Sequence, residues 1–391
     1  MRATDNQGSF LNRISIRRNQ VVSMDNNHEQ ELEDIELFQK HVGDRFADLL
    51  SPAEDTSVDA LLSIAWLRKI LDVFLCCEAE FKAIMIMGRD PSQISKPPLD
   101  RLLHELLDRV VKTLDVCNAV SHGVDAVRHF QKLAEIAVSA LEQRPIGDGQ
   151  VRRAKKALNS LAVAMTLEDK DGAVGKSTER AWSFGRRGGG GGAVNKDRNP
   201  GNFRPICWNM AKGWSASKQI QAMSSNLVAP RGGETLAVPI YISSMVMVFV
   251  MWALAAAIPC QERTGLGNHF SVPRQLSWAQ SMMGLQEKIS EEWKKKEKKG
   301  SAGLLEEMQK MEKLAQSLTE FADNFQFPAE PERLEEVENQ VAELAEICKK
   351  MEEGLVPLQQ QLREVFHRVV RSRAEILDAL EQGGKSSASI M

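Results

Sequence analysis

Hydrophobic and polar positions alternate with helical spacing over most of the chain. The first such series, at steps of three and four residues, runs through Leu32, Ile35, Phe38, Val42, Phe46 and Leu49. This spacing places the apolar side chains on one face of an α-helix, which Ser51-Pro52 ends. A second helix is predicted from about Asp55 to Met87, and it is apolar enough to be a buried central helix.

The helical spacing continues after Pro97-Pro98, a pair that breaks one helix and favours the start of the next. Helical patterns follow over 102–117 and 124–136, and Gly123 between them predicts a tight corner that joins two antiparallel helices. A further helix is predicted over 150–165. Together these segments have the composition of a helical bundle.

One segment departs from the amphipathic pattern because it is apolar on all sides. Between Leu236 and Ile258 the plainly polar side chains are Ser243 and Ser244. As a helix this segment would extend about 35 Å, and the hydrocarbon core of a bilayer is about 30 Å thick. The residues that mark it as a candidate membrane segment are Leu236, Ile240, Met245, Val246, Phe249, Val250, Trp252, Leu254 and Ile258.

The same segment also fits the central helix of a soluble bundle. Pro239 and Pro259 bracket an apolar core that is short for a membrane span. Neither flank has a clear excess of Lys and Arg, so the positive-inside rule gives no orientation. The sequence leaves two alternatives open. The chain is either a single-pass membrane protein, or a protein of the cytosol or the cytosolic face of membranes that buries this helix.

The C-terminal region is charged and helical. A helix with a short interruption is predicted over 282–325, and two prolines then break it. Beyond them, apolar residues recur strictly at alternating steps of three and four, which predicts a coiled-coil-like seam. The seam residues are Leu334, Val337, Val341, Leu344, Cys348, Met351 and Leu355. The seam could pack against a helix of the same chain or join two chains. Gly354 and Pro357 are predicted to end it before a last helix.

Between the two helical regions the composition changes. Residues 170–231 carry eleven Lys or Arg against three acids, a net charge of +8, and include a five-glycine run at 188–192. This composition cannot bury enough apolar surface to fold alone, which predicts a disordered basic linker. Its tryptophans and positive charge, next to the apolar segment, also suggest contact with anionic membrane lipid.

Composition and motifs exclude several classes of function. The net charge of the 391-residue chain is −3, which argues against a nucleic-acid binder. Six cysteines are scattered without metal-ligand spacing and are expected to be reduced core residues. Gly172 and Gly175 stand too close together for a phosphate-binding loop. No catalytic residues, metal site or cofactor are predicted, and we expect the chain not to be an enzyme.

The patterns together predict an all-α fold, with a helical bundle of long antiparallel helices, a disordered basic linker and one strongly apolar helix. The predicted division is a flexible basic leader (1–27), an N-terminal helical bundle (28–166), the linker (167–234), the apolar helix (235–261), a C-terminal helical block (262–382) and a flexible tail (383–391).

Four stretches of the chain carry a family resemblance. They are QGSFLNRISIRRNQVVSM, ELEDIELFQKHVGDRFADLL, WSASKQIQAMSSNLVAPRGGE and VMVFVMWALAAAIPCQER. Through them the chain resembles the plant ROH-type proteins, a BYPASS-related family defined by a domain of unknown function. The resemblance extends from Gly8 to about Gln382.

The resemblance implies a function that the residues alone do not. Members of this family are linked to polarised secretion, interact with the membrane-binding subunit of the exocyst and restrain the deposition of cell-wall mucilage. The chain is therefore expected to be a non-catalytic regulator of exocytosis. The alternative is a membrane-resident adaptor, like the BYPASS branch, in developmental or root-to-shoot signalling. The resemblance implies no particular binding residues.

Overall fold

A computed structural model describes residues 24–51, 60–87, 89–170, 214–230, 236–260, 276–297, 303–327 and 331–388, with residues 8, 10, 11, 12 and 14 of the N-terminal segment. All regular structure in these ranges is helical, which confirms the predicted all-α fold. The helices are α2 (Met24–Leu50), α3 (Ile64–Met85), α4 (Pro91–Ile94), α5 (Leu99–Leu141), α6 (Asp148–Lys170), α7 (Ala216–Ser224), α8 (Ala237–Ala257), η3 (Ser277–Ala279), α9 (Gln280–Glu297), α10 (Glu306–Asp323) and α11 (Pro331–Ala388).

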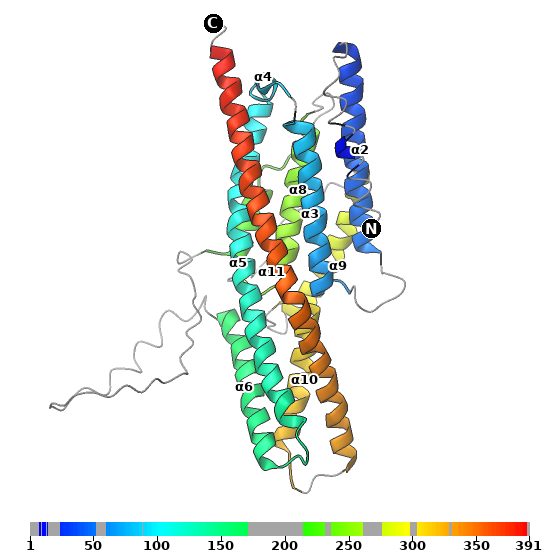
Figure 1. Ribbon diagram of the computed structural model, residues 1–391, viewed down its shortest axis with the longest axis vertical. Helices are drawn as coiled ribbons and strands as arrows, with labels where there is room; N and C mark the ends of the chain where they lie inside the picture. Colours follow the sequence, from blue (N-terminus) through cyan, green and yellow to red (C-terminus); the bar gives the residue numbers. More distant parts are fainter. Residues whose placement is uncertain are drawn as a thin grey trace, which may run out of the picture.

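The helices form one elongated bundle (Figure 1). Two long helices, α5 and α11, run along most of its length and contact each other. At 1.5 Å per residue α5 extends about 64 Å and α11 about 87 Å. The half that contains α4 also holds α2, α3 and α8, and the other half holds α6 and α10. Helices predicted as an N-terminal bundle and a C-terminal block therefore share one hydrophobic core.

The apolar helix α8 lies inside this core. It contacts α2, α3, α5, α7 and α9, and all its residues from Pro239 to Ala257 are buried. The Phe249 ring packs edge-on against Phe46 of α2, with centroids 5.3 Å apart. Met251 Sδ lies 3.8 Å from Cys117 Sγ of α5. By length and composition α8 could cross a membrane, and within the bundle α2, α3, α5, α7 and α9 pack on it.

A buried ion pair joins α2 to α3. Arg45 donates from both terminal nitrogens to the Glu80 carboxylate, at 2.5 and 3.0 Å. His41 Nδ1 lies 3.2 Å from the same carboxylate, and the Glu80 side chain is 0% exposed. Burial alone would raise the pKa of Glu80, but the bonds from Arg45 and His41 outweigh it and leave the pKa below its ordinary value. The pair fixes how α2 aligns with α3.

A junction of three helix ends ties the C-terminal region to the rest. The amides of Leu304 and Leu305 donate to the last carbonyls of α8, those of Ala256 and Ala257, each at 3.0 Å. Glu307, in the first turn of α10, accepts from the amide of Ile64 at the start of α3, at 3.0 Å. These bonds satisfy backbone groups that helix ends leave unpaired. The start of α10 therefore caps α8 and α3 together.

The predicted corner at Gly123 is wrong, because α5 is one continuous helix through that position. A Cβ on Gly123 would lie 2.1 Å from the carbonyl oxygen of Pro259. The glycine is therefore needed for a close approach between α5 and the end of α8, not for a turn.

The predicted end of the seam at Gly354 and Pro357 is also wrong, because α11 continues through both. Proline lacks the amide that would bond to the carbonyl four residues earlier. Packing on either side offsets this loss, since Leu355 and Leu358 are buried. A Cβ on Gly354 would lie 2.8 Å from Cγ2 of Ile64, so this glycine lets α11 pass close to α3.

Other predicted boundaries need smaller corrections. Residues 216–224 of the predicted linker form α7, whose Ile220 and Met223 are fully buried, because Ser215 caps an amphipathic turn that packs on α5 and α8. Phe10 of the predicted leader is buried beside His41, with ring centroids 5.3 Å apart. The predicted tail begins inside α11. The linker portions 171–213 and 231–234 lie outside the described residues.

Candidate binding surfaces

The residues predicted as a membrane segment lie on all sides of α8 and at its two ends. All are buried except Leu236, which is partly buried at the first end. No face of α8 between Ile240 and Ile258 is exposed to solvent. The segment is therefore placed as core within the bundle and offers no surface to a partner in this arrangement.

The predicted seam on α11 packs inside the chain. Six of its seven residues are buried, and Cys348 Sγ lies 4.0 Å from the carbonyl oxygen of Gln131 on α5. The seventh, Leu334, is half-buried against a small separate cluster formed by Ile146, Val151 and Ala322. The seam therefore packs against helices of the same chain in this structure, which is the first of the two alternatives left open by the sequence.

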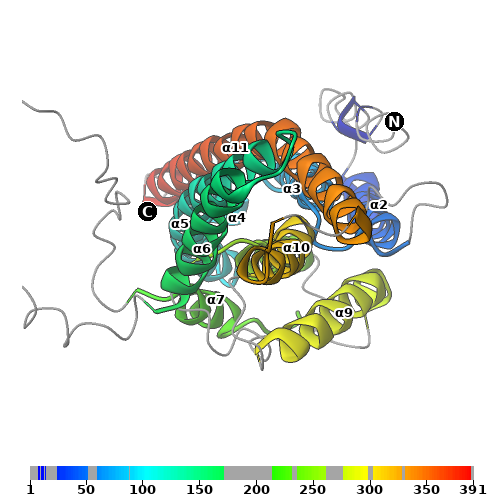
Figure 2. The same ribbon diagram turned by 90° about the horizontal axis from the view of Figure 1, so that it is seen from below.

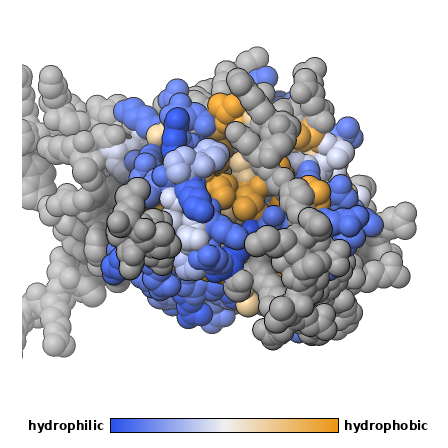
Figure 3. Space-filling model, turned by 90° about the horizontal axis from the view of Figure 1, so that it is seen from above, coloured by the Kyte–Doolittle hydropathy of each residue, from blue (hydrophilic) through white to orange (hydrophobic). Residues whose placement is uncertain are grey.

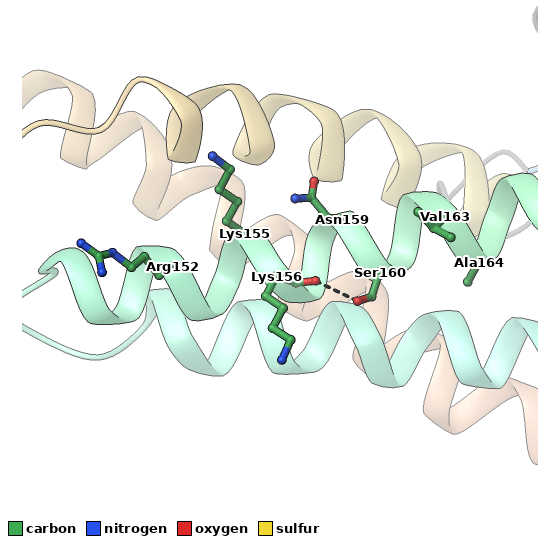
Figure 4. Close-up of a pocket in the computed structure, with 7 residues that line it drawn as sticks. All are labelled: Arg152, Lys155, Lys156, Asn159, Ser160, Val163 and Ala164. Atoms are coloured by element: carbon green, nitrogen blue, oxygen red, sulfur yellow. Dashed lines mark hydrogen bonds between the residues drawn. The ribbon is translucent and has the colours of Figure 1, made fainter. Parts of the chain in front are cut away.

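The outer face of α6 carries positive charge. Arg152, Arg153 and Lys156 are exposed on it, and Val163 is 54% exposed. Figure 4 shows Arg152, Lys156 and Val163 along a single helix, α6. Lys155 is turned toward α10, where it pairs with Asp323 at 2.7 Å. The face is a surface for a large partner, not an enclosed pocket.

A groove of about 290 Å³ lies between α6 and α10. Its floor is formed by the buried residues Leu158, Leu161, Met165, Met308 and Ala315. Its rim is polar and is formed by Asn159, Thr166, Glu312, Gln316, Thr319 and Glu320. Two methionines in the floor let it adapt to different shapes, because the thioether side chain is unbranched and flexible. The groove could accept the apolar face of a helix.

A further group of hydrophobic side chains is exposed at the end of the bundle where α4 lies, surrounded by hydrophilic ones (Figure 3). Met87 and Leu32 are exposed large apolar residues, and an ion pair between Arg89 and Glu31 brings their two segments together.

The described residues carry little sign of reaction chemistry. Among them, no group of three or more His, Cys, Asp or Glu could hold a metal ion. Of the cysteines that the structure places, Cys76 is partly buried and the others are buried, and all are thiols. Burial raises the pKa of the Cys77 and Cys117 thiols to about 12, which keeps them as unreactive thiols at neutral pH.

Sequence reasoning did not find the groove. Its floor residues have ordinary helical spacing, and the pattern cannot show that α6 and α10 leave a gap where they meet. The one available signal was indirect. The apolar stripe of α6 extends to Ala162 and Val163, both exposed, and is therefore wider than one neighbouring helix would cover.

Comparison with known proteins identifies the family. The family described as "Protein ROH1-like" matches residues 1–380. The chain is 60% identical over 414 aligned residues to Protein ROH1A of Arabidopsis thaliana, which covers 100% of this chain and 99% of that protein. It is 43% identical over 362 residues to Protein ROH1D of the same plant, which covers 88% and 87%. No solved structure matches. The chain belongs to the ROH1-like family.

Proposed function

We propose that the chain is a non-catalytic regulator of polarised secretion. In this proposal it binds the membrane-binding subunit of the exocyst and modulates exocytosis, including the deposition of cell-wall mucilage. Membership of the ROH1-like family supports the proposal, because the resemblance implies this partner and process. The observation that carries it is the groove between α6 and α10, an apolar floor with a polar rim that an amphipathic helix fits.

The rim of the groove suggests the chemistry of the partner segment. Glu312 and Glu320 are both exposed along α10, and they favour basic residues at the edges of a docked helix. The apolar face of that helix would cover Leu158, Leu161 and Met308. Affinity would come mainly from a few apolar side chains inserted between the two helices.

We propose that α8 stays in the core while the partner provides the contact with membranes. Removing α8 would expose the apolar faces of α3 and α5 that now pack on it, including Phe74, Leu106 and Val110, which line one cavity together with Val246 of α8. Fully burying one such side chain contributes about 1.5–3 kcal/mol. The chain would then be a protein of the cytosol and of the cytosolic face of membranes.

The alternative is a membrane-resident adaptor of the BYPASS type. The length and composition of α8 favour this reading. It requires α8 to leave the bundle and the other helices to pack again around the gap.

Two neighbouring residues of α6 provide a test of the groove. Ala162 and Val163 are both exposed, but Ala162 lines the groove and Val163 lies on the basic outer face. Binding of the purified exocyst subunit should fall by at least about tenfold in Ala162→Arg, because a long charged side chain enters the groove. Val163→Arg adds the same charge to the same helix and should bind within about twofold of the unchanged chain.

The outcomes separate the possibilities. Loss of binding in Val163→Arg alone would move the contact to the outer face of α6 and refute the groove. If the unchanged chain does not bind the subunit at micromolar concentrations, the proposed partner is wrong. Thermal melting of each variant confirms that the fold is retained.

A further inference from the structure

A second cavity lies at the first two turns of α8, in the half of the bundle that contains α4. Its volume is about 260 Å³, near the lower end of the range of small-molecule sites. Three elements line it: α5, the segment after α7, and α8. Its apolar walls are Leu102, Leu227, Val228, Ala229, Pro230, Ala237 and Ile240. Val228 is 77% exposed, so the cavity is open to solvent on that side.

The cavity has a buried positive charge. Arg109 of α5 lines it, and the Arg109 side chain is almost fully buried. Its Nε donates to the carbonyl oxygen of Met223 at 3.0 Å, and Nη2 donates to that of Ser225 at 3.4 Å. These two carbonyls hold the plane of the guanidinium in place. Because a guanidinium has five N–H donors, they leave some of its donors for a further acceptor.

The nearest acid, Glu105, also lines the cavity, and its ion pair with Arg109 offsets only part of this charge. Glu105 Oε2 lies 3.8 Å from Arg109 Nη2, beyond hydrogen-bond distance, and Glu105 Oε1 accepts from Nε of Arg101 at 3.2 Å. One carboxylate is therefore shared between two guanidinium groups. Asp108 also faces this side of α5 but is exposed, where water screens its charge.

A buried hydroxyl without a partner faces the same cavity. Ser244 of α8 is 1% exposed, and its Oγ makes no hydrogen bond. A buried polar atom left without a partner is costly, so such a group often indicates a ligand or a bound water. Helices α5 and α8 run in the same direction, since Leu102 lies by Ala237 and Gly123 by Pro259. Arg109 and Ser244 stand seven residues beyond Leu102 and Ala237, and therefore at the same depth.

We propose that this cavity binds a small monocarboxylate with an apolar body. The carboxylate would accept hydrogen bonds from the Arg109 guanidinium and the Ser244 hydroxyl at the inner end of the cavity. The apolar body would lie against Leu102, Ala237 and Ile240 and reach the opening at Val228. Hydrogen bonds between a guanidinium and a carboxylate are stronger than those between neutral groups, which makes the charge the main source of selectivity.

Octanoate is a suitable probe, and 1-octanol is its uncharged counterpart with the same chain length. Isothermal titration of the full chain should give an affinity for octanoate at least about tenfold higher than for 1-octanol. Replacement Ser244→Ala should weaken octanoate binding by about fivefold. Ser243→Ala is the matched control, because Ser243 is the adjacent buried serine but lines a different cavity, with Glu78 and Ser372.

Ala229→Trp provides a second variant that does not change the core, since Ala229 is only partly buried at the rim. The larger ring should narrow the cavity and weaken octanoate binding by about tenfold or more. Three results would overturn the proposal: no binding of octanoate at millimolar concentration, equal affinity for 1-octanol, or equal losses in Ser243→Ala and Ser244→Ala.

Discussion

The buried pair of Arg45 and Glu80 allows a sharp prediction about stability. Replacement Glu80→Ala leaves the Arg45 guanidinium buried without its two bonds to the carboxylate, at 2.5 and 3.0 Å. Removing one partner of a buried ion pair costs about 3–5 kcal/mol. With a urea m-value of about 3 kcal/mol/M, the midpoint of unfolding should fall by about 1–1.7 M. Circular dichroism at 222 nm measures this directly, because the described chain is helical.

The double replacement Arg45→Met with Glu80→Leu is the decisive control. It removes both charges and fills the space with apolar side chains, so it should be much more stable than Glu80→Ala alone. The reasoning would be refuted if Glu80→Ala shifted the midpoint by less than about 0.3 M, or if the double variant were as unstable as the single one.

The same pair sets a dependence on acid. The pKa of Glu80 is lowered in the folded chain, so its contribution to stability is present above the unfolded pKa of about 4.3 and is lost as the pH falls through the lower folded value. Below about pH 4 the free energy of unfolding of the unchanged chain should therefore include a decrease due to protonation of Glu80, and that of the double variant should not.

Three further predictions concern single residues. Gly123→Ala should destabilise the chain by about 1–3 kcal/mol in urea unfolding, because the added Cβ would meet the Pro259 carbonyl oxygen at 2.1 Å. The control is Gly149→Ala, whose added Cβ has no atom within 4 Å and which should be neutral or slightly stabilising. Burial raises the pKa of Glu78, so the free energy of unfolding falls as the pH rises past the ordinary glutamate range. Glu78→Gln should therefore raise the melting temperature at pH 8 and leave it nearly unchanged at pH 4. Equal shifts of the melting temperature at the two pH values would contradict this. Cys77 and Cys117, with thiol pKa values of about 12, should resist iodoacetamide at pH 8 until the chain unfolds, and rapid native labelling read by mass spectrometry would show that the helices around them open.

Local patterns in the sequence predicted most of the helices. The spacing of apolar residues in α2 and α6, and the prolines before α5, depend only on residues close in the chain. The same reasoning failed at Gly123, because a glycine in a helical pattern can mark either a turn or a close contact. Only the position of Pro259, far along the chain, decides between the two.

Local patterns could not predict the candidate sites either, because residues far apart in the sequence line them. The groove between α6 and α10 combines Met165 with Met308, and the cavity at the start of α8 combines Arg109 with Ser244. Each pair is separated by more than a hundred residues.

The central claim is that α8 is a core helix of the folded chain, and carbonate extraction of membranes from cells that express the full chain tests it most directly. The matched variant changes Val246, Phe249 and Leu254, all buried in α8, to Asp. The account predicts that carbonate releases the unchanged chain and that the variant aggregates or unfolds, because three charges enter the core. An unchanged chain that resists extraction, beside a variant that becomes soluble, would contradict the account and place α8 in a bilayer.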